Sequence, residues 1–290
     1  MEKKIKIALF SPSSPPSPSI FEKALKILKS YGLSYKSFVD FSSEPPSFRA
    51  FLLFEILSTG EFSHIWATRG GFGAIKLLPY LEELFNSSTK RFSFLPFLIG
   101  FSDITILHLY FYKKFKKLGF HAPMVLNLPN LSKKNLELLQ EVVFRGKGNF
   151  LKGKAFIEGE GEGILIGGNL TTLASLCGTP YFSLEEPFLL FIEDVKEPLY
   201  RLERSFLQIL FTLKKDHFKG LILGSLGKVD PLEFLEQIKE FLPENLPIGY
   251  NFPFGHIKNN YPLIIGKRTY LRVKNSSAEL HQEGIPLSFF

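Results

Sequence analysis

The chain has 290 residues, of which 45% are apolar and 22% are charged, and this composition excludes an intrinsically disordered protein. Its formal charge of +7 would suit nucleic acid, but the basic residues are scattered and form no stripe interleaved with aromatic residues. We therefore expect no nucleic-acid partner.

Cysteine usage and apolar runs set further limits. The single cysteine, Cys177, cannot form a disulfide framework or build a zinc site by itself. The apolar run at residues 5–10 is too short for a signal peptide, and none approaches the roughly 18 residues of a membrane span. We expect a cytoplasmic protein with no membrane partner, no metal and no cofactor.

The first 125 residues predict strands that alternate with helices. Apolar patterns indicate strands at 5–10, 33–38 and 94–100, a further strand that starts at 64 and runs into the glycine cluster, and helices at 20–30, 48–57 and 104–115. This alternation predicts a parallel sheet covered on both faces. In such sheets ligands gather at the carboxyl ends of the strands, where both Gly70-Gly71 and Ser102 are expected.

Ser102 lies between a predicted strand and a predicted helix. Such a turn exposes a serine Oγ, and the helix start offers free N–H groups to an oxyanion. The motif is imperfect, because Ile104 replaces the second glycine of G-x-S-x-G. The alternative is an N-cap, with Asp103 or Ser102 accepting a hydrogen bond from the first turn.

The glycine cluster at 70–73 has two interpretations. Glycines before a helix allow a ligand to approach the backbone, but neither dinucleotide nor P-loop spacing is present. A tight turn between strand and helix explains the cluster equally well.

The second half of the chain has a different pattern. A helical pattern at 136–143 ends the expected first domain at 145, and the lysines and glycines of 146–155 favour a linker before a second domain at 156–290. Acids alternate with glycines over 158–163 without EF-hand spacing, which favours an exposed edge or turn over a calcium loop. Asn169 is a candidate helix cap.

The most buried-looking strand, at 188–195, has two carboxylates near its end, Glu193 and Asp194, and a carboxylate there is well placed to orient a histidine. His256 follows a glycine in a loop and is the best general-base candidate. His121 remains open as a second one. The other four histidines favour structural or solvent-facing roles: His64, His108, His217 and His281.

Taken together, these segments resemble the LD-carboxypeptidases, peptidase family S66, which also includes the microcin C immunity peptidases. The matching pieces follow the family's order and span nearly the whole chain. They are residues 11–13, 68–73, 100–105, 121–124, 167–170, 192–195 and 255–256.

The resemblance implies a Ser-His-Glu serine peptidase. In it Ser102 is the nucleophile, His256 the general base and Glu193 the group that orients His256, while the backbone N–H groups of Gly71 and Asp103 form the oxyanion hole. It implies an N-terminal flavodoxin-like α/β domain, similar to class I glutamine amidotransferases, that carries the serine. A smaller C-terminal α/β domain carries the other two residues, so the site lies between the domains.

The resemblance also implies the reaction. It is hydrolysis of the L,D-amide that releases terminal D-alanine from murein tetrapeptides, in cytoplasmic peptidoglycan recycling, without metal and commonly as a homodimer. Phe72 and Phe101 stand where tyrosine is common, which leaves the exact specificity open. The identity of the third substrate residue, lysine or diaminopimelate, is open as well. Arg69 either pairs with the substrate carboxylate or braces the glycine loop.

Two alternatives remain. A microcin C immunity-type enzyme would cleave peptidyl or aminoacyl nucleotides, and a non-catalytic module would only bind wall peptides. The presence of Ser102, Glu193 and His256 together argues against the second. A glutamine amidotransferase is disfavoured because Cys177 follows no suitable strand and turn.

Overall fold

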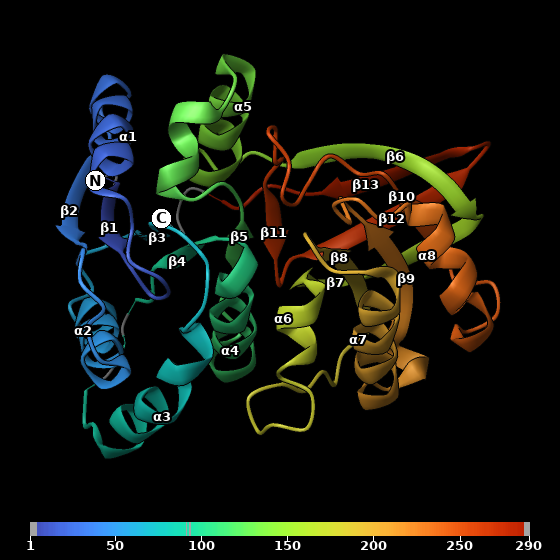
Figure 1. Cartoon of the computed structure of the whole chain (residues 1–290), viewed down its shortest axis with the longest axis horizontal. Helices are drawn as coiled ribbons and strands as arrows, with labels where there is room; N and C mark the ends of the chain where they lie inside the picture. The colour runs from blue at the N-terminus through green and yellow to red at the C-terminus, as the bar shows by residue number, and fades with distance from the viewer. Residues whose placement is uncertain (1–4, 91, 93, 287–290) are drawn as a thin grey trace.

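The computed structural model describes residues 5–90, 92 and 94–286, and its strands form two sheets (Figure 1). In the first sheet the order is β11-β5-β4-β3-β1-β2. All neighbours are parallel except β11, which pairs antiparallel with β5. The order β2-β1-β3-β4-β5 is that of a flavodoxin-like sheet, which confirms the predicted fold class. The strands are β1 (Lys6–Phe10), β2 (Ser34–Phe38), β3 (His64–Ala67), β4 (Phe97–Gly100), β5 (Gly119–His121) and β11 (Leu263–Ile265).

Helices cover both faces of this sheet. In β1, Ile7 and Leu9 face one apolar cluster while Ala8 and Phe10 face the other, as the two-residue period of a strand requires. The first cluster includes residues of α1, and the second includes residues of α2, α3 and α4. The helices are α1 (Pro18–Ser30), α2 (Pro46–Ser58), α3 (Leu78–Ser87), α4 (Thr105–Phe115) and α5 (Lys133–Leu139).

The second sheet is a closed barrel in the order β10-β6-β13-β12-β7-β8-β9. Strands β7 to β10 run parallel to one another, and β6, β12 and β13 are antiparallel to their neighbours. The strands are β6 (Asn149–Ile157), β7 (Gly159–Asn169), β8 (Phe188–Glu193), β9 (Phe218–Leu223), β10 (Ile248–Tyr250), β12 (Arg268–Lys274) and β13 (Ser277–Gln282). Its helices are α6 (Leu170–Ala174), α7 (Leu199–Thr212) and α8 (Pro231–Ile238).

Strand β6 occupies most of segment 146–155, where the sequence favoured a linker. The lysines of that segment are the exposed face of a strand, since Lys152 and Lys154 alternate with the buried Leu151 and the partly buried Gly153. Similarly, the acid and glycine alternation after residue 158 is the start of β7, with its glutamates exposed. The division into domains 1–145 and 156–290 stays a prediction.

Two features connect the part of the chain that forms the barrel with the part that forms the first sheet. Strand β11 follows the loop that carries His256 and returns to the first sheet, where Leu263 pairs with His121. Helices α4 and α6 are also in contact, and Figure 1 shows them side by side near the middle of the molecule. Within residues 5–90, 92 and 94–286, no helix has the length and apolar character needed to cross a membrane.

Candidate active site

Ser102 is separated from the end of β4 by Phe101 alone, and it starts the 3₁₀ turn η2 (Ser102–Ile104), which leads into α4. Its φ is +63°, a left-handed conformation that a serine rarely adopts and that is common at functional turns. A Cβ on Gly100 would lie 2.9 Å from Cγ1 of the buried Ile104. A side chain at position 100 would collide with Ile104. Glycine at position 100 therefore makes room for the large residue at position 104.

Phe101, the residue before Ser102, packs against His256. Their ring centroids are 4.8 Å apart in an edge-to-face arrangement. On another side, the Phe101 ring lies 5.7 Å from that of His121. The loop that contains Ser102 and the loop that contains His256 are therefore in direct contact.

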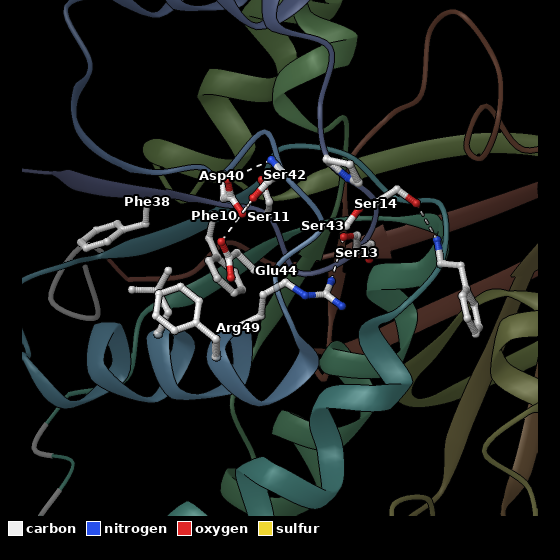
Figure 2. A pocket seen from close by; sticks show the side chains of 14 residues that line it. Phe10, Ser11, Ser13, Ser14, Phe38, Asp40, Ser42, Ser43, Glu44 and Arg49 are labelled. Carbon is white, nitrogen blue, oxygen red and sulfur yellow. Dashed lines mark hydrogen bonds between the residues drawn. The ribbon is translucent and has the colours of Figure 1, made fainter.

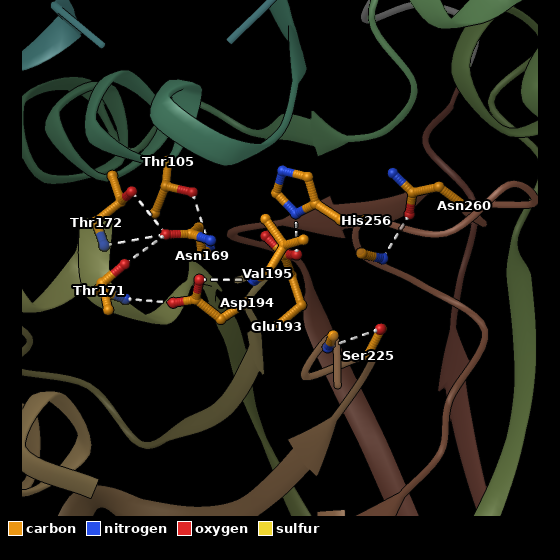
Figure 3. Close-up of polar contacts among 12 residues, drawn as sticks. Thr105, Asn169, Thr171, Thr172, Glu193, Asp194, Val195, Ser225, His256 and Asn260 are labelled. Atoms are coloured by element: carbon orange, nitrogen blue, oxygen red, sulfur yellow. Dashed lines mark hydrogen bonds and ion pairs between the residues drawn. The ribbon is translucent and has the colours of Figure 1, made fainter. Parts of the chain in front are cut away.

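His256 is held by a buried carboxylate (Figure 3). Its Nδ1 lies 2.6 Å from Oε2 of Glu193, the last residue of β8, whose side chain is fully buried. Burial opposes the charged imidazolium, but the hydrogen bond and negative charge of Glu193 outweigh it, so the pKa of His256 is above its ordinary value. Burial also raises the pKa of Glu193, and His256 opposes that effect.

The backbone before His256 is fixed by Asn260, which the sequence analysis missed. Gly255 has φ of +107° and donates its N–H to Asn260 Oδ1 at 2.9 Å. A Cβ on Gly255 would lie 2.8 Å from Cβ of Glu193, so only glycine fits there. Because Asn260 acts on the backbone across a loop, no motif in the sequence reveals it.

Asn169 caps α6, as predicted. Its Oδ1 accepts hydrogen bonds from the N–H and the hydroxyl of Thr172 at 3.1 and 2.7 Å. Its backbone N–H donates to Thr105 Oγ1 at 3.1 Å, which joins α6 to the start of α4. Asp194, the second carboxylate after β8, accepts from the Thr171 N–H at 2.9 Å and so supports the same helix start.

The prediction that Asp103 or Ser102 caps the following helix is wrong, since neither η2 nor α4 has a side-chain cap. Asp103 Oδ2 instead accepts from Ser13 Oγ at 2.6 Å and from the Ala74 N–H at 2.8 Å. Burial raises the pKa of Asp103, although these hydrogen bonds and Arg49 oppose it. Asp103 thus ties the turn at Ser102 to the loops that follow β1 and β3.

Substituting Asp103→Ala should lower the free energy of unfolding by about 2–4 kcal/mol, because two buried donors lose a carboxylate acceptor. Ser13→Ala removes only one of these hydrogen bonds and should cost less. Urea unfolding of both variants beside the wild type measures the difference. Equal stability of Asp103→Ala and the wild type would contradict this role.

The glycine loop lies against Ser102. A Cβ on Gly70 would be 3.0 Å from Ser102 Cβ and 3.1 Å from its Oγ. The next residue, Gly71, has φ of +107° and packs on Ser14. Arg69 donates from Nη1 to the Pro15 carbonyl at 3.2 Å, as expected for a residue that braces this loop. The oxyanion roles of the Gly71 and Asp103 N–H groups stay predictions.

Gly70→Ala should reduce kcat/KM by about 10²-fold while the fold persists, because φ at Gly70 is not positive and the atoms nearest to the new methyl group belong to the side chains of Ser102 and Met124. Steady-state kinetics together with thermal unfolding checks this. Full activity in Gly70→Ala would mean that Ser102 is not at the reacting centre.

A second hollow lies at the same edge of the first sheet (Figure 2). It has a volume of about 140 Å³ and is lined by residues of β1, β2, the loops after them and α2, and by Phe72, but not by Ser102, Glu193 or His256. On its wall Arg49 donates to the carbonyls of Pro12 and Ser13 at 2.7 and 2.8 Å. Arg49 thereby holds the loop after β1, whose Ser13 donates to Asp103.

Two of the histidines that were predicted to be structural or solvent-facing are buried in the fold. His64 and His108 are buried, and His108 Nε2 lies 2.9 Å from the Gly100 carbonyl. His121 is also fully buried, and neither ring nitrogen has a hydrogen-bond partner among the described residues. Burial places the pKa of His121 well below its ordinary value, so it is neutral and packs as an aromatic ring.

Over the described part of the chain, no three His, Cys, Asp or Glu side chains are grouped to hold a metal ion. Glu193 at the end of β8 binds His256, and Phe101, the residue before Ser102, packs on the His256 ring. A serine, a histidine and a carboxylate of this kind are suited to acyl transfer.

Comparison with known proteins identifies the family of the chain. The model of the LD-carboxypeptidase N-terminal domain matches residues 7–122, and that of the LD-carboxypeptidase C-terminal domain matches residues 162–271. The murein tetrapeptide carboxypeptidase of Pseudomonas aeruginosa is 28% identical over 293 residues, with 92% of each chain covered.

Solved structures agree as well. The muramoyltetrapeptide carboxypeptidase from Oxalobacter formigenes superimposes with a TM-score of 0.82 and 27% identity, covering 96% of this chain and 100% of the other. An MccF-like protein from Bacillus anthracis, 22% identical with 98% of each chain covered, shares the fold with a TM-score of 0.84. The two family models together match more than half of the chain, which therefore belongs to the LD-carboxypeptidase family and is an enzyme of that kind.

Proposed function

We propose that this enzyme is a serine carboxypeptidase that hydrolyses the L,D-amide of murein tetrapeptides and releases D-alanine. Ser102 is the nucleophile, His256 the general base and acid, and Glu193 the carboxylate that orients His256. The observation that carries the proposal is the fully buried Glu193 bound to His256 Nδ1, with His256 packed on the residue before a strained Ser102.

In the acylation step, Ser102 Oγ attacks the carbonyl carbon of the scissile amide while Nε2 of His256 takes the hydroxyl proton. The tetrahedral oxyanion accepts hydrogen bonds from the N–H groups of Gly71 and Asp103. His256 then gives its proton to the D-alanine nitrogen as the C–N bond breaks. D-alanine leaves, and the remaining peptide is an ester on Ser102.

In the deacylation step, water attacks the ester carbonyl and His256 takes its proton. The bond from carbon to Ser102 Oγ breaks, and the oxygen recovers its proton from His256. Throughout, Glu193 accepts the hydrogen bond from Nδ1–H, which fixes the tautomer and stabilises the imidazolium. Its burial keeps water from competing for that hydrogen bond.

The biological setting is also a proposal. We infer that the enzyme acts in cytoplasmic peptidoglycan recycling and forms a homodimer, as the resemblance of the sequence implies. Relatives named as murein tetrapeptide and muramoyltetrapeptide carboxypeptidases support murein peptides as the substrate class.

The decisive test compares three substrates for the purified enzyme: an L,D-linked murein tetrapeptide, a D,D-linked pentapeptide and an aminoacyl nucleotide. We expect D-alanine only from the tetrapeptide, quantified with a D-amino-acid oxidase assay. Cleavage of the aminoacyl nucleotide alone would favour the microcin C immunity activity. A folded protein that binds the tetrapeptide without cleaving it would favour a binding module.

A further inference from the structure

A cavity of about 320 Å³ opens beside His256. It lies between the loop after β10 and the segment that follows β5. The residues that line it are Phe101, Pro123, Asn127, Asn130, Leu131, His256, Ile257, Lys258 and Asn260. Because Phe101 precedes Ser102 and packs on His256, this cavity adjoins the reacting centre.

The polar groups of this cavity are mainly donors. None of the described residues that line it is acidic. Lys258 is exposed, and its ammonium forms no ion pair with any described carboxylate. Asn127 uses its Oδ1 to accept from the Met124 N–H, which leaves its amide N–H₂ as the donor. This set of groups suits an anion.

Asn260 points to the same conclusion independently. The residue is 3% exposed, and its Oδ1 is occupied by the Gly255 N–H (Figure 3). Its Nδ2 is buried without a hydrogen-bond partner among the described residues. A buried amide N–H₂ without an acceptor is unfavourable, and a carboxylate in the adjoining cavity would satisfy it.

The chemistry of the reaction places a carboxylate here. His256 must give a proton to the leaving nitrogen, so that nitrogen comes within hydrogen-bond distance of its ring. The α-carboxylate of the leaving residue is separated from this nitrogen by a single carbon atom. Donors that recognise a free C-terminus must therefore lie beside His256, as Lys258 and Asn260 do.

We propose that this cavity binds the free α-carboxylate of the departing D-alanine, with Lys258 supplying the charge and Asn260 a hydrogen bond. The inference rests on the proposed function and deepens it, because it explains why the enzyme would remove a terminal residue. Arg69, the other candidate for this task, is engaged with the Pro15 carbonyl.

The test compares the L,D-tetrapeptide with its C-terminal amide, which lacks the negative charge. Lys258→Ala should lower the acid-to-amide ratio of kcat/KM about tenfold, and Lys258→Glu should lower it further, since a charge-assisted contact contributes about this much. Asn260→Asp keeps the acceptor for the Gly255 N–H but repels the carboxylate, and it should lower the ratio as well. Lys219→Ala, a matched change on β9, should leave the ratio unchanged.

Two results would overturn the carboxylate site while leaving the proposed function in place. One is an acid-to-amide ratio of kcat/KM that stays the same in both Lys258 variants and in Asn260→Asp. The other is an acid-to-amide ratio that falls in Arg69→Ala but not in Lys258→Ala. Failure of the wild type to hydrolyse either peptide would instead refute the proposed function, and the carboxylate site with it.

Discussion

Substitution of Ser102 by alanine should lower kcat/KM for the L,D-tetrapeptide by about 10⁴- to 10⁶-fold, the largest effect expected of any single change. Without Oγ no ester can form, and only binding and the oxyanion donors remain. The left-handed φ of +63° at this residue places it at a turn, so removal of the hydroxyl changes few packing contacts. Continuous assay of D-alanine measures the loss.

The matched control is Ser47→Ala, which removes an exposed hydroxyl from α2. Both variants should show the far-UV circular dichroism and thermal midpoint of the wild type. Ser102→Ala activity within tenfold of the wild type would contradict its assignment as nucleophile.

Glu193→Gln should lower kcat/KM by about 10³- to 10⁴-fold, because an amide neither fixes the histidine tautomer nor stabilises the imidazolium. The substitution keeps the size of a side chain that has no exposed surface, so the packing around it can persist. Kinetics under single-turnover conditions separate this effect from weaker substrate binding. A higher KM with an unchanged kcat would contradict the orienting role.

The pH dependence of kcat/KM in the wild type and in Glu193→Gln gives a second test of this pairing. His256 must be neutral to act as a base, so kcat/KM of the wild type should rise with pH through the pKa of His256, which Glu193 raises above the ordinary histidine value. In Glu193→Gln the negative charge that raises this pKa is lost and any hydrogen bond to Nδ1 is to a neutral oxygen, while burial, which lowers the pKa, remains. The acidic limb should therefore move to lower pH, and an unmoved limb would contradict the pairing.

The sequence predicted the first sheet well, because strands buried on both faces have continuous apolar runs. Strands β1, β3 and β4 follow this rule. It did not predict β6, where Lys152 and Lys154 flank a glycine, or the start of β7, where exposed glutamates alternate with glycines and give no apolar signal. Nor could it predict β11, because this three-residue strand pairs with β5 far along the chain.

The same contrast applies to the site. Ser102 comes shortly after one buried strand, Glu193 ends another, and His256 lies in a loop after a glycine, so local patterns locate all three as candidates. Asp103 was assigned to the wrong partner because its hydrogen bonds reach residues 90 and 29 positions away. Contacts at such separations depend on the tertiary fold rather than on local sequence.

The most direct test of the central claim is mass spectrometry of the enzyme, quenched in acid during turnover of the L,D-tetrapeptide. The account predicts an adduct with the mass of the tripeptide acyl group, mapped to the fragment that contains Ser102 and absent from Ser102→Ala. An adduct on any other residue, or full-rate release of D-alanine by Ser102→Ala, would contradict it.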